Sequence, residues 1–215
     1  MSTLAQIRDI INRKTQDPNN VARSASVVDE EINRAVRYYQ SYPFGFNERR
    51  TDITLVDGDQ RVSGIPSDVI MELQVGGLIL VDEQVRIDLI KLHPNNFSER
   101  DDDQTGRPYF YTYRDQSYDL LPTPNKAFTL QFRYLKKYEN LVNDTDTNDF
   151  TEQAQDLIVL HCLAKIYAED KQDSNLGAYY ERLRAEELKT LRDRTDPRIG
   201  TGYLDSRSIL DEFYI

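Results

Sequence analysis

The stretch Phe128-Thr129-Leu130-Gln131-Phe132-Arg133-Tyr134 carries a large apolar side chain at every second position. A period of two is typical of a β-strand with one buried face. Pro122-Thr123-Pro124 precedes this stretch and favours a turn, so residues 118–121 on the other side of the turn are expected to be its partner strand. The centre of the chain is therefore expected to contain a β-sheet.

Strand-like sequence extends toward the amino terminus from this stretch. Ile53 and Leu55 lead into Asp57-Gly58, a pair that favours a hairpin turn, and then into Val62. Alternating and β-branched residues continue over 69–92. The whole region from about residue 51 is expected to be rich in strands.

Helical periodicity precedes the strands. Thr3 and Gln6 have the spacing of a capping box for a first helix, and a second helix is expected to start at Ser26. The second helix has an apolar stripe that consists of Val28, Ile32, Ala35, Val36 and Tyr39. A short polar linker joins the two segments, so we expect them to fold back on each other as a hairpin.

Two further helices are expected after the strands. Asp149 is expected to cap the first, with Glu152 at its third position. Residues 157–168 are apolar almost all round, which predicts a central core helix with Leu160 and Leu163 buried. The last helix is expected to turn Leu176, Tyr180, Leu183 and Leu191 inward and to end by Asp196-Pro197.

These patterns predict an α+β protein. A helical body, made of an amino-terminal helix pair and two carboxy-terminal helices, is expected to carry a central strand-rich insertion and an extended carboxy-terminal arm. The expected parts are amino-terminal helices over 1–50, the insertion over 51–140, carboxy-terminal helices over 141–196 and the arm over 197–215.

The charge of the chain limits its expected partners. Its 215 residues include 37 acidic and 27 basic side chains, a formal net charge of −10, and the basic residues are spread among acids. Binding to a phosphate backbone or an anionic membrane needs a cluster of uncompensated cations, and none is visible. No apolar run is long enough for a membrane span and no signal-peptide core is present, so we expect a soluble, unsecreted protein. The single cysteine, Cys162, excludes an intrachain disulfide.

Motifs of catalysis are absent from the sequence. There is no phosphate-binding glycine loop, no Gly-x-Ser-x-Gly elbow and no His-Glu-x-x-His pair. His161 and Cys162 are adjacent on an expected helix, where their side chains point about 100° apart and cannot form a nucleophile–base pair on their own. We therefore expect no catalytic residue, no metal and no cofactor.

Two acidic loops are candidates for a cation site. Residues 101–106 begin like an EF-hand loop, but Thr112 stands where a chelating glutamate is needed. Asp144, Asp146 and Glu152 have partly suitable spacing, so a metal-dependent enzyme that uses these carboxylates is the alternative function. The ordinary role of such residues before a helix is in turns and caps.

The densest aromatic cluster is Tyr109-Phe110-Tyr111-Thr112-Tyr113, with only Arg107 and Arg114 as nearby cations. Base stacking works beside basic grooves, so strand packing or a protein interface is the expected role.

Three motifs carry a resemblance to a known family: Gly106-Arg107-Pro108-Tyr109-Phe110, then Tyr118-Asp119-Leu120-Leu121-Pro122-Thr123-Pro124, then the strand that ends at Tyr134. Their succession resembles the head–tail adaptor (connector) proteins of short-tailed bacteriophages. The resemblance includes the amino-terminal helix pair around Glu31-Ile32-Asn33-Arg34-Ala35 and the helix expected after Asp149, so it extends over most of the chain.

The resemblance implies a structural virion protein. Such a protein forms a homo-oligomeric ring, commonly a dodecamer, between the capsid portal and the tail or nozzle protein, and DNA passes through its channel without specific binding. It would be found at the head–tail junction of the virion, and in the host cytoplasm during assembly, with no membrane partner. A siphophage-type head-completion connector is the related alternative.

The resemblance also implies two contact regions. The arm would dock on the portal or on a neighbouring subunit through Tyr203, Leu210, Phe213, Tyr214 and Ile215. The strand-rich insertion would face tail components through Arg107, Tyr109, Tyr111 and Tyr113.

Overall fold

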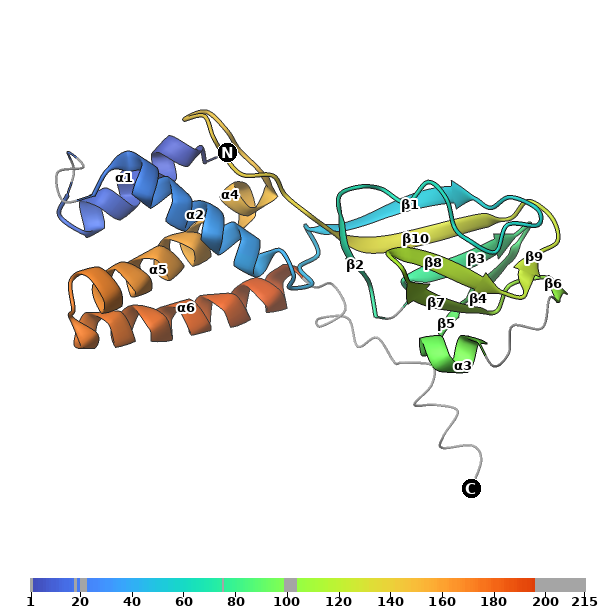
Figure 1. Cartoon of the computed structure of the whole chain (residues 1–215). Helices are drawn as coiled ribbons and strands as arrows, with labels where there is room; N and C mark the ends of the chain where they lie inside the picture. Colours follow the sequence, from blue (N-terminus) through green and yellow to red (C-terminus); the bar gives the residue numbers. More distant parts are fainter. Residues whose placement is uncertain (1, 18, 20–22, 75, 99–103, 196–215) are drawn as a thin grey trace, which may run out of the picture. The chain divides into compact units, whose positions relative to one another are not determined.

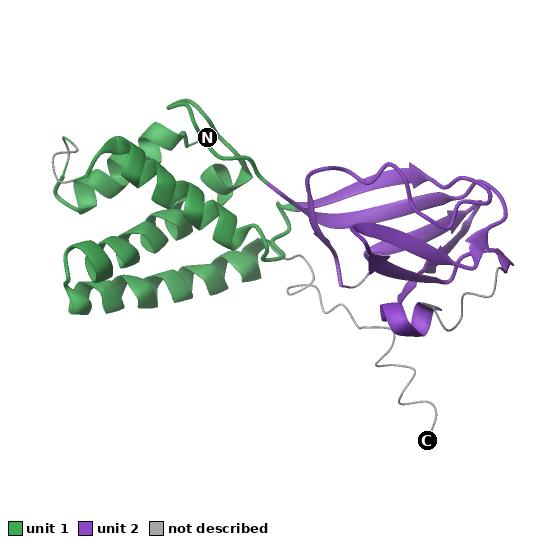
Figure 2. Cartoon of the chain, in the orientation of Figure 1, with its two compact units in different colours: residues 1–47, 138–215 green, residues 48–137 purple. Residues whose placement is uncertain are grey.

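The computed structural model describes residues 2–17, 19, 23–74, 76–98 and 104–195. The chain divides into two compact units, coloured separately in Figure 2. Unit 1 consists of Met1–Asn47 and Tyr138–Ile215, and unit 2 of Glu48–Lys137. Unit 1 is helical and unit 2 is rich in strands, which confirms the predicted α+β class.

Unit 1 is a bundle of helices from both ends of the sequence (Figure 1). They are α1 (Leu4–Lys14), α2 (Ala25–Tyr39), α4 (Asp149–Gln153), α5 (Gln155–Lys165), the π-helical turn η1 (Ile166–Asp170) and α6 (Ser174–Thr195). The predicted capping box of α1 is confirmed, because the Gln6 amide donates to Thr3 Oγ1 (3.3 Å) and the Thr3 amide to Gln6 Oε1 (3.0 Å).

Two helix starts differ from the predictions. Helix α2 begins with Ser24 at the N-cap, before the predicted Ser26. The cap of α4 is Asn148 and not Asp149: Asn148 Oδ1 accepts from the Thr151 amide (3.0 Å), and Thr151 Oγ1 accepts from the Asn148 amide (3.0 Å). The side chains of Asn148 and Thr151 thus form a capping box. Asp149 instead lies in the first turn, beside the positive end of the helix dipole.

The core of unit 1 unites the amino-terminal and carboxy-terminal helices. Its fully buried members include Leu4, Ile7, Ile11, Ile32, Ala35, Tyr39, Phe44, Phe150, Leu157, Ile158, Cys162, Leu163 and Leu191. The prediction that Leu163 is buried is confirmed, whereas Leu160 is only half-buried, because the packing around α5 leaves that position open on one side.

The inward face of α6 also differs from the prediction at its start. Leu176 is exposed, and its neighbour Gly177 is buried against η1. A Cβ atom at Gly177 would lie 3.1 Å from the Cβ atom of Ala168, so the two backbones approach too closely for a larger side chain. Tyr180 and Leu183 are half-buried, and Leu191 is buried as predicted.

The π-helical turn η1 is tied to the carboxy-terminal end of α1. Lys171 Nζ donates to the Thr15 carbonyl (2.5 Å), and the Tyr167 hydroxyl donates to the Lys14 carbonyl (3.0 Å). The last carbonyls of a helix have no partner within the helix, so these two side chains satisfy them. The first and last thirds of the chain are thereby joined at this point.

Unit 2 consists of three sheets and one short helix. Its elements are β1 (Glu48–Thr54), β2 (Val69–Glu72), β3 (Leu78–Asp82), β4 (Val85–Asp88), β5 (Ile90–Lys91), α3 (Pro94–Ser98), β6 (Thr105–Gly106), β7 (Phe110–Arg114), β8 (Ser117–Leu121), β9 (Thr123–Pro124) and β10 (Thr129–Lys136). The largest sheet has the order β1-β10-β3-β4, with β2 also paired to β10. The others are β5-β7-β8 and the pair β6-β9.

The predicted strand is β10, but its predicted partner is wrong. Residues 118–121 belong to β8, which pairs with β7, whereas β10 is antiparallel to β1 on one side and to β3 and β2 on the other. The chain does turn at Asp57-Gly58, where Gly58 has a φ of +80°. It does not return along β1, because β10 occupies that edge, and the Val62 amide instead donates to the Tyr118 carbonyl (2.9 Å).

The two larger sheets share one core. Sheet β1-β10-β3-β4 contributes residues such as Leu80, Leu130 and Phe132, and sheet β5-β7-β8 contributes Tyr111 and Leu120. The Phe132 and Tyr118 rings meet edge to face at 5.3 Å between centroids. Alternating side chains from both sheets thus fill one interior.

Candidate interaction sites

The tyrosine segment on β7 is only partly available at the surface. Tyr109 and Tyr113 are 46% and 47% exposed, but Tyr111 is 5% exposed and belongs to the core. Burial raises the pKa of Tyr111 to about 12. Tyr111 lies within β7 and packs in the core that the two larger sheets share, whereas Tyr109 precedes β7 and Tyr113 lies near its end. Tyr111 therefore has a packing role in unit 2, and the expected contact of this segment with tail components stays a prediction.

Arg107 has an internal partner. Its guanidinium donates to Asp82, which also accepts from Lys126 Nζ (2.8 Å). Asp82 is buried at the end of β3, and the hydrogen bonds from Lys126 and Arg107 hold the pKa of its carboxyl below the ordinary value. This cluster joins the segment before β7 to the larger sheet. The Arg107 side chain is still 39% exposed, and its contact with tail components stays a prediction.

A second carboxylate that bonds to other side chains of unit 2 is Glu72 on β2. It accepts from Lys91 and from the Tyr118 hydroxyl (2.8 Å). Burial acts to raise the pKa of Glu72, but the hydrogen bonds from Lys91 and Tyr118 outweigh it, and the pKa lies below its ordinary value. Burial and the same contact raise the pKa of Tyr118. This hydroxyl is a hydrogen-bond donor at neutral pH.

Asp119 on β8 is, like Asp82, a buried carboxylate of unit 2. Arg61 Nε lies 3.3 Å from one of its oxygens, and the Arg114 guanidinium donates to the other. Arg114 also lies over the Phe97 ring of α3 at 5.3 Å. Sequence analysis gave Arg114 no role, because a pairing to a residue in the adjacent strand depends on the register.

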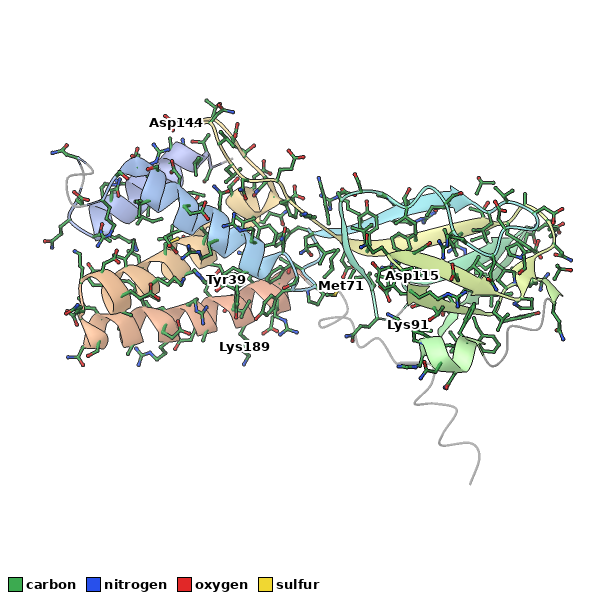
Figure 3. All side chains as sticks on the ribbon, in the orientation of Figure 1. Tyr39, Met71, Lys91, Asp115, Asp144 and Lys189 are labelled. Atoms are coloured by element: carbon green, nitrogen blue, oxygen red, sulfur yellow. The ribbon has the colours of Figure 1, made fainter. Side chains whose placement is uncertain are left out.

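The acidic loop before α4 has a structural role at the start of α1. The carbonyls of Asp144 and Asp146 accept from the amides of Ala5 (3.1 Å) and Leu4 (3.0 Å). The Asp144 carboxylate pairs with Arg8 (2.7 Å). The first amides of a helix have no internal partner, so the loop supplies acceptors for α1. Figure 3 shows Asp144 near the tip of this loop.

The carboxylate of Asp146 is used within the loop itself. It accepts from the amides of Asn143 and Val142, both at 2.8 Å, and these bonds lower its pKa. Glu152 is exposed on α4. No group of three or more His, Cys, Asp or Glu side chains suitable for a metal ion occurs within the described ranges. Of the carboxylates of the alternative enzyme, Asp144 thus forms an ion pair and Asp146 stabilises a turn of unit 1.

His161 is part of a buried polar cluster that sequence analysis missed. Its Nδ1 lies 3.3 Å from the Tyr39 hydroxyl. Arg184 Nη1 donates a hydrogen bond to the same hydroxyl (3.3 Å). Figure 3 labels Tyr39 among the helices of unit 1. Burial, with repulsion from Arg184, lowers the pKa of His161 to about 4, and burial raises that of Tyr39 to about 12. Both groups are neutral at physiological pH. Cys162 is fully buried, and burial raises its pKa.

Unit 1 also exposes several large apolar side chains. They are Val27 and Tyr38 on α2, Val142 in the loop before α4, and Leu176 and Tyr179 on α6. Such residues are suited to contacts with another protein. The expected docking residues of the arm, Tyr203, Leu210, Phe213, Tyr214 and Ile215, lie outside the described residues, as do Asp101, Asp102 and Asp103. Within the described part of the chain, no helix has the length and apolar character of a membrane span.

The strand-rich unit is inserted in the sequence between the helices of unit 1, which is the organisation that the resemblance to phage head–tail adaptors implied. The comparison with known families assigns the chain to this class, because a family model described as SU10 adaptor protein matches residues 2–203. The chain therefore belongs to the SU10 adaptor protein family, which confirms the resemblance and identifies a structural adaptor of the phage virion. No curated protein matches the chain.

Proposed function

We propose that this adaptor forms a homo-oligomeric ring, a dodecamer, between the capsid portal and the tail or nozzle protein. The match to the adaptor family over residues 2–203 carries this proposal. A protein that joins two virion components needs separate contact surfaces for each, and the chain has two compact units of different construction. In this proposal the helical unit is the ring body and the strand-rich unit meets tail components.

The exposed apolar side chains of unit 1 support an oligomeric body. Tyr38 and Tyr179 are each nearly half exposed on α2 and α6, and Val142 is 77% exposed. A monomer gains nothing from such exposure, whereas a neighbouring subunit would bury it. On unit 2, Tyr109 and Tyr113 are the exposed residues of the expected tail-facing set.

The acidic charge supports passage of DNA without binding. Each chain carries a formal charge of −10, so twelve copies carry about −120. If acidic side chains line the channel, phosphates are repelled from its wall. Short duplex DNA should therefore show no retardation at physiological salt, and tight, steeply salt-dependent binding would contradict a passive channel.

The arm is proposed to anchor the subunit through Leu210, Phe213, Tyr214 and Ile215, with Tyr203 nearer its base. An apolar tip after a glycine-containing segment suits a peptide that orders on meeting a partner. Deleting residues 205–215 should leave the melting temperature of the monomer nearly unchanged and abolish assembly on the portal. Unfolding of the shortened monomer, or its normal assembly, would contradict this role.

The decisive experiment is two-dimensional averaging of electron micrographs of the protein mixed with its portal. A ring of adaptor density on the portal is the expected result. A monomer under all conditions, with and without portal, would reject the proposal. Subunit counting by mass measurement of the complex then tests the dodecamer separately from ring formation.

A further inference from the structure

The larger sheet of unit 2 has a hollow of about 400 Å³ on one face. It is lined by four arginines, Arg49, Arg50, Arg86 and Arg133, and by Glu48, Ile79 and Gln131. These residues come from β1, β10, β3 and β4, so all four strands in the order of the sheet contribute. The hollow is thus built on hydrogen-bonded strands and not on loops.

The strand register brings like charges together in this hollow. Arg50 on β1 lies directly opposite Arg133 on β10. Like charges at directly opposite positions destabilise an antiparallel pair, so the sheet would be more stable with another residue at one of them. A bound anion would reduce the electrostatic repulsion between Arg50 and Arg133.

The nearby carboxylates offset this charge only in part. Asp52 lies 3.1 Å from Arg50, and Glu48 lies 3.7 Å from Arg133. Asp88 is the partner of Ile79 in the register and is a third acid near the hollow. Arg86 forms no ion pair within the described residues, although it lies within electrostatic range of Asp52. Cations therefore outnumber acids here, on a chain with a net charge of −10.

Gln131 supplies a polar side chain to the hollow. It is 6% exposed and lies between Asp52 on β1 and Ile79 on β3 in the strand register. Gln131 offers both a donor and an acceptor to a ligand in the hollow.

We propose that this arginine hollow binds an acidic segment of another polypeptide. Guanidinium groups of Arg50, Arg86 and Arg133 would pair with its carboxylates, and the Gln131 amide would bond to its polar groups. Glu48, Asp52 and Asp88 favour a peptide over a nucleic acid, because they would repel a continuous run of phosphates but leave room for isolated carboxylates. The inference does not depend on the proposed ring.

The test uses the full chain and a short fluorescein-labelled peptide in which Glu and Ser alternate. In an extended peptide every second side chain lies on one side, so its carboxylates face the hollow together. Fluorescence anisotropy at low salt is expected to show binding that weakens with added salt. The Arg86→Gln and Arg133→Gln variants should each weaken it about tenfold.

Two further variants separate binding from structure. Arg182→Gln makes the same charge change on the exposed face of α6 and should leave binding unchanged. Gln131→Leu should weaken binding and leave the melting temperature nearly unchanged, because it removes the amide and keeps a side chain of similar size at this buried position. A purely structural role of Gln131 would instead lower the melting temperature and leave binding intact.

Three outcomes would overturn the inference. They are an absence of binding at about 1 mM peptide, binding that the hollow variants do not weaken, and equal weakening by Arg182→Gln. Short duplex DNA and inorganic phosphate serve as competing probes. If DNA binds more tightly than the peptide and Arg86→Gln abolishes it, the hollow is a phosphate site and the assignment to an acidic polypeptide is wrong.

Discussion

The two units differ in the buried polar groups that they contain. In the helical unit these groups are mostly neutral, as in Asn33, Asn47 and His161, and Asp17 is the buried acid among the described residues. In the strand-rich unit the carboxylates of Asp82 and Asp119 are each held between two cations. Most buried polar groups of the helical unit are thus neutral, whereas the buried carboxylates of the strand-rich unit form ion pairs. The two units should therefore respond differently to mutation and to acid.

The largest effect is expected from Phe132→Ala in the strand-rich unit. Phe132 is fully buried on β10 and contacts the rings of Tyr118 and Tyr134, so its loss should cost about 3–5 kcal/mol of unfolding free energy. Urea denaturation followed by circular dichroism measures this loss. Thr54→Ala, at an exposed position of β1, is the control. If the two units unfold separately, only the transition of unit 2 moves, and a shift of both would show that they are coupled.

Leu163→Ala makes the corresponding change in the helical unit. Leu163 is fully buried on α5, and the truncation should cost about 2–5 kcal/mol. Leu160→Ala, one turn earlier at a half-buried position, should cost roughly half as much. Equal losses at the two positions would mean that α5 is covered equally on both sides, contrary to the structure.

Mild acid should destabilise the helical unit before the strand-rich unit. Unfolded His161 takes up a proton near pH 6.5, whereas burial lowers its folded pKa to about 4. Between these values the unfolded state binds more protons, so the free energy of unfolding falls as pH falls, by at most about 3 kcal/mol. His161→Gln should remove this dependence, as measured by urea denaturation across the range.

The strand-rich unit should lose stability at a lower pH than the helical unit does. Glu72 and Asp82 have ordinary pKa values of 4.5 and 3.8, and their folded values are lower. Their contribution is present above these ordinary values and is lost as pH falls through the lower folded ones. A common acid transition of both units, unchanged in His161→Gln, would contradict the contrast between them.

The smallest effect is expected from Asn33→Ala in the helical unit. The Asn33 side chain accepts from the Leu141 amide (2.7 Å) and donates to the Leu141 carbonyl (2.9 Å), so it replaces a backbone partner for that residue. Its removal leaves two buried groups unpaired and should cost about 2 kcal/mol. Asn175→Ala, at an exposed position near the start of α6, is the control, and an equal loss there would rule out this specific role.

Sequence periodicity predicted which segments are strands but not how they pair. The strand predicted around residues 128–134 is confirmed as β10. Its neighbours are β1, β2 and β3, and not the predicted segment 118–121. A turn such as Pro122-Thr123-Pro124 indicates a change of direction, and local sequence then favours the nearest segment as the partner. The central strand of a sheet has two neighbours, and local sequence does not identify either one.

The arginine hollow and the polar cluster at His161 could not be predicted from the sequence for a related reason. In a strand that alternates, Gln131 occupies a position that normally faces solvent, and only the tertiary structure shows that it is buried. The contacts of His161 come from α2 and α6, far away in the sequence. The helix cap at Thr3 was predictable because all its atoms lie within four residues.

The pairing of β1 with β10 has a consequence for how such a chain can change over time. These are the first and last strands of unit 2, and Glu48 lies opposite Leu135, so the module enters and leaves at neighbouring positions one strand spacing apart. A short turn could join the helical segments in its place, and another module with adjacent ends could replace it. With adjacent ends, the strand-rich unit could be exchanged as a whole during evolution while the helical unit is kept.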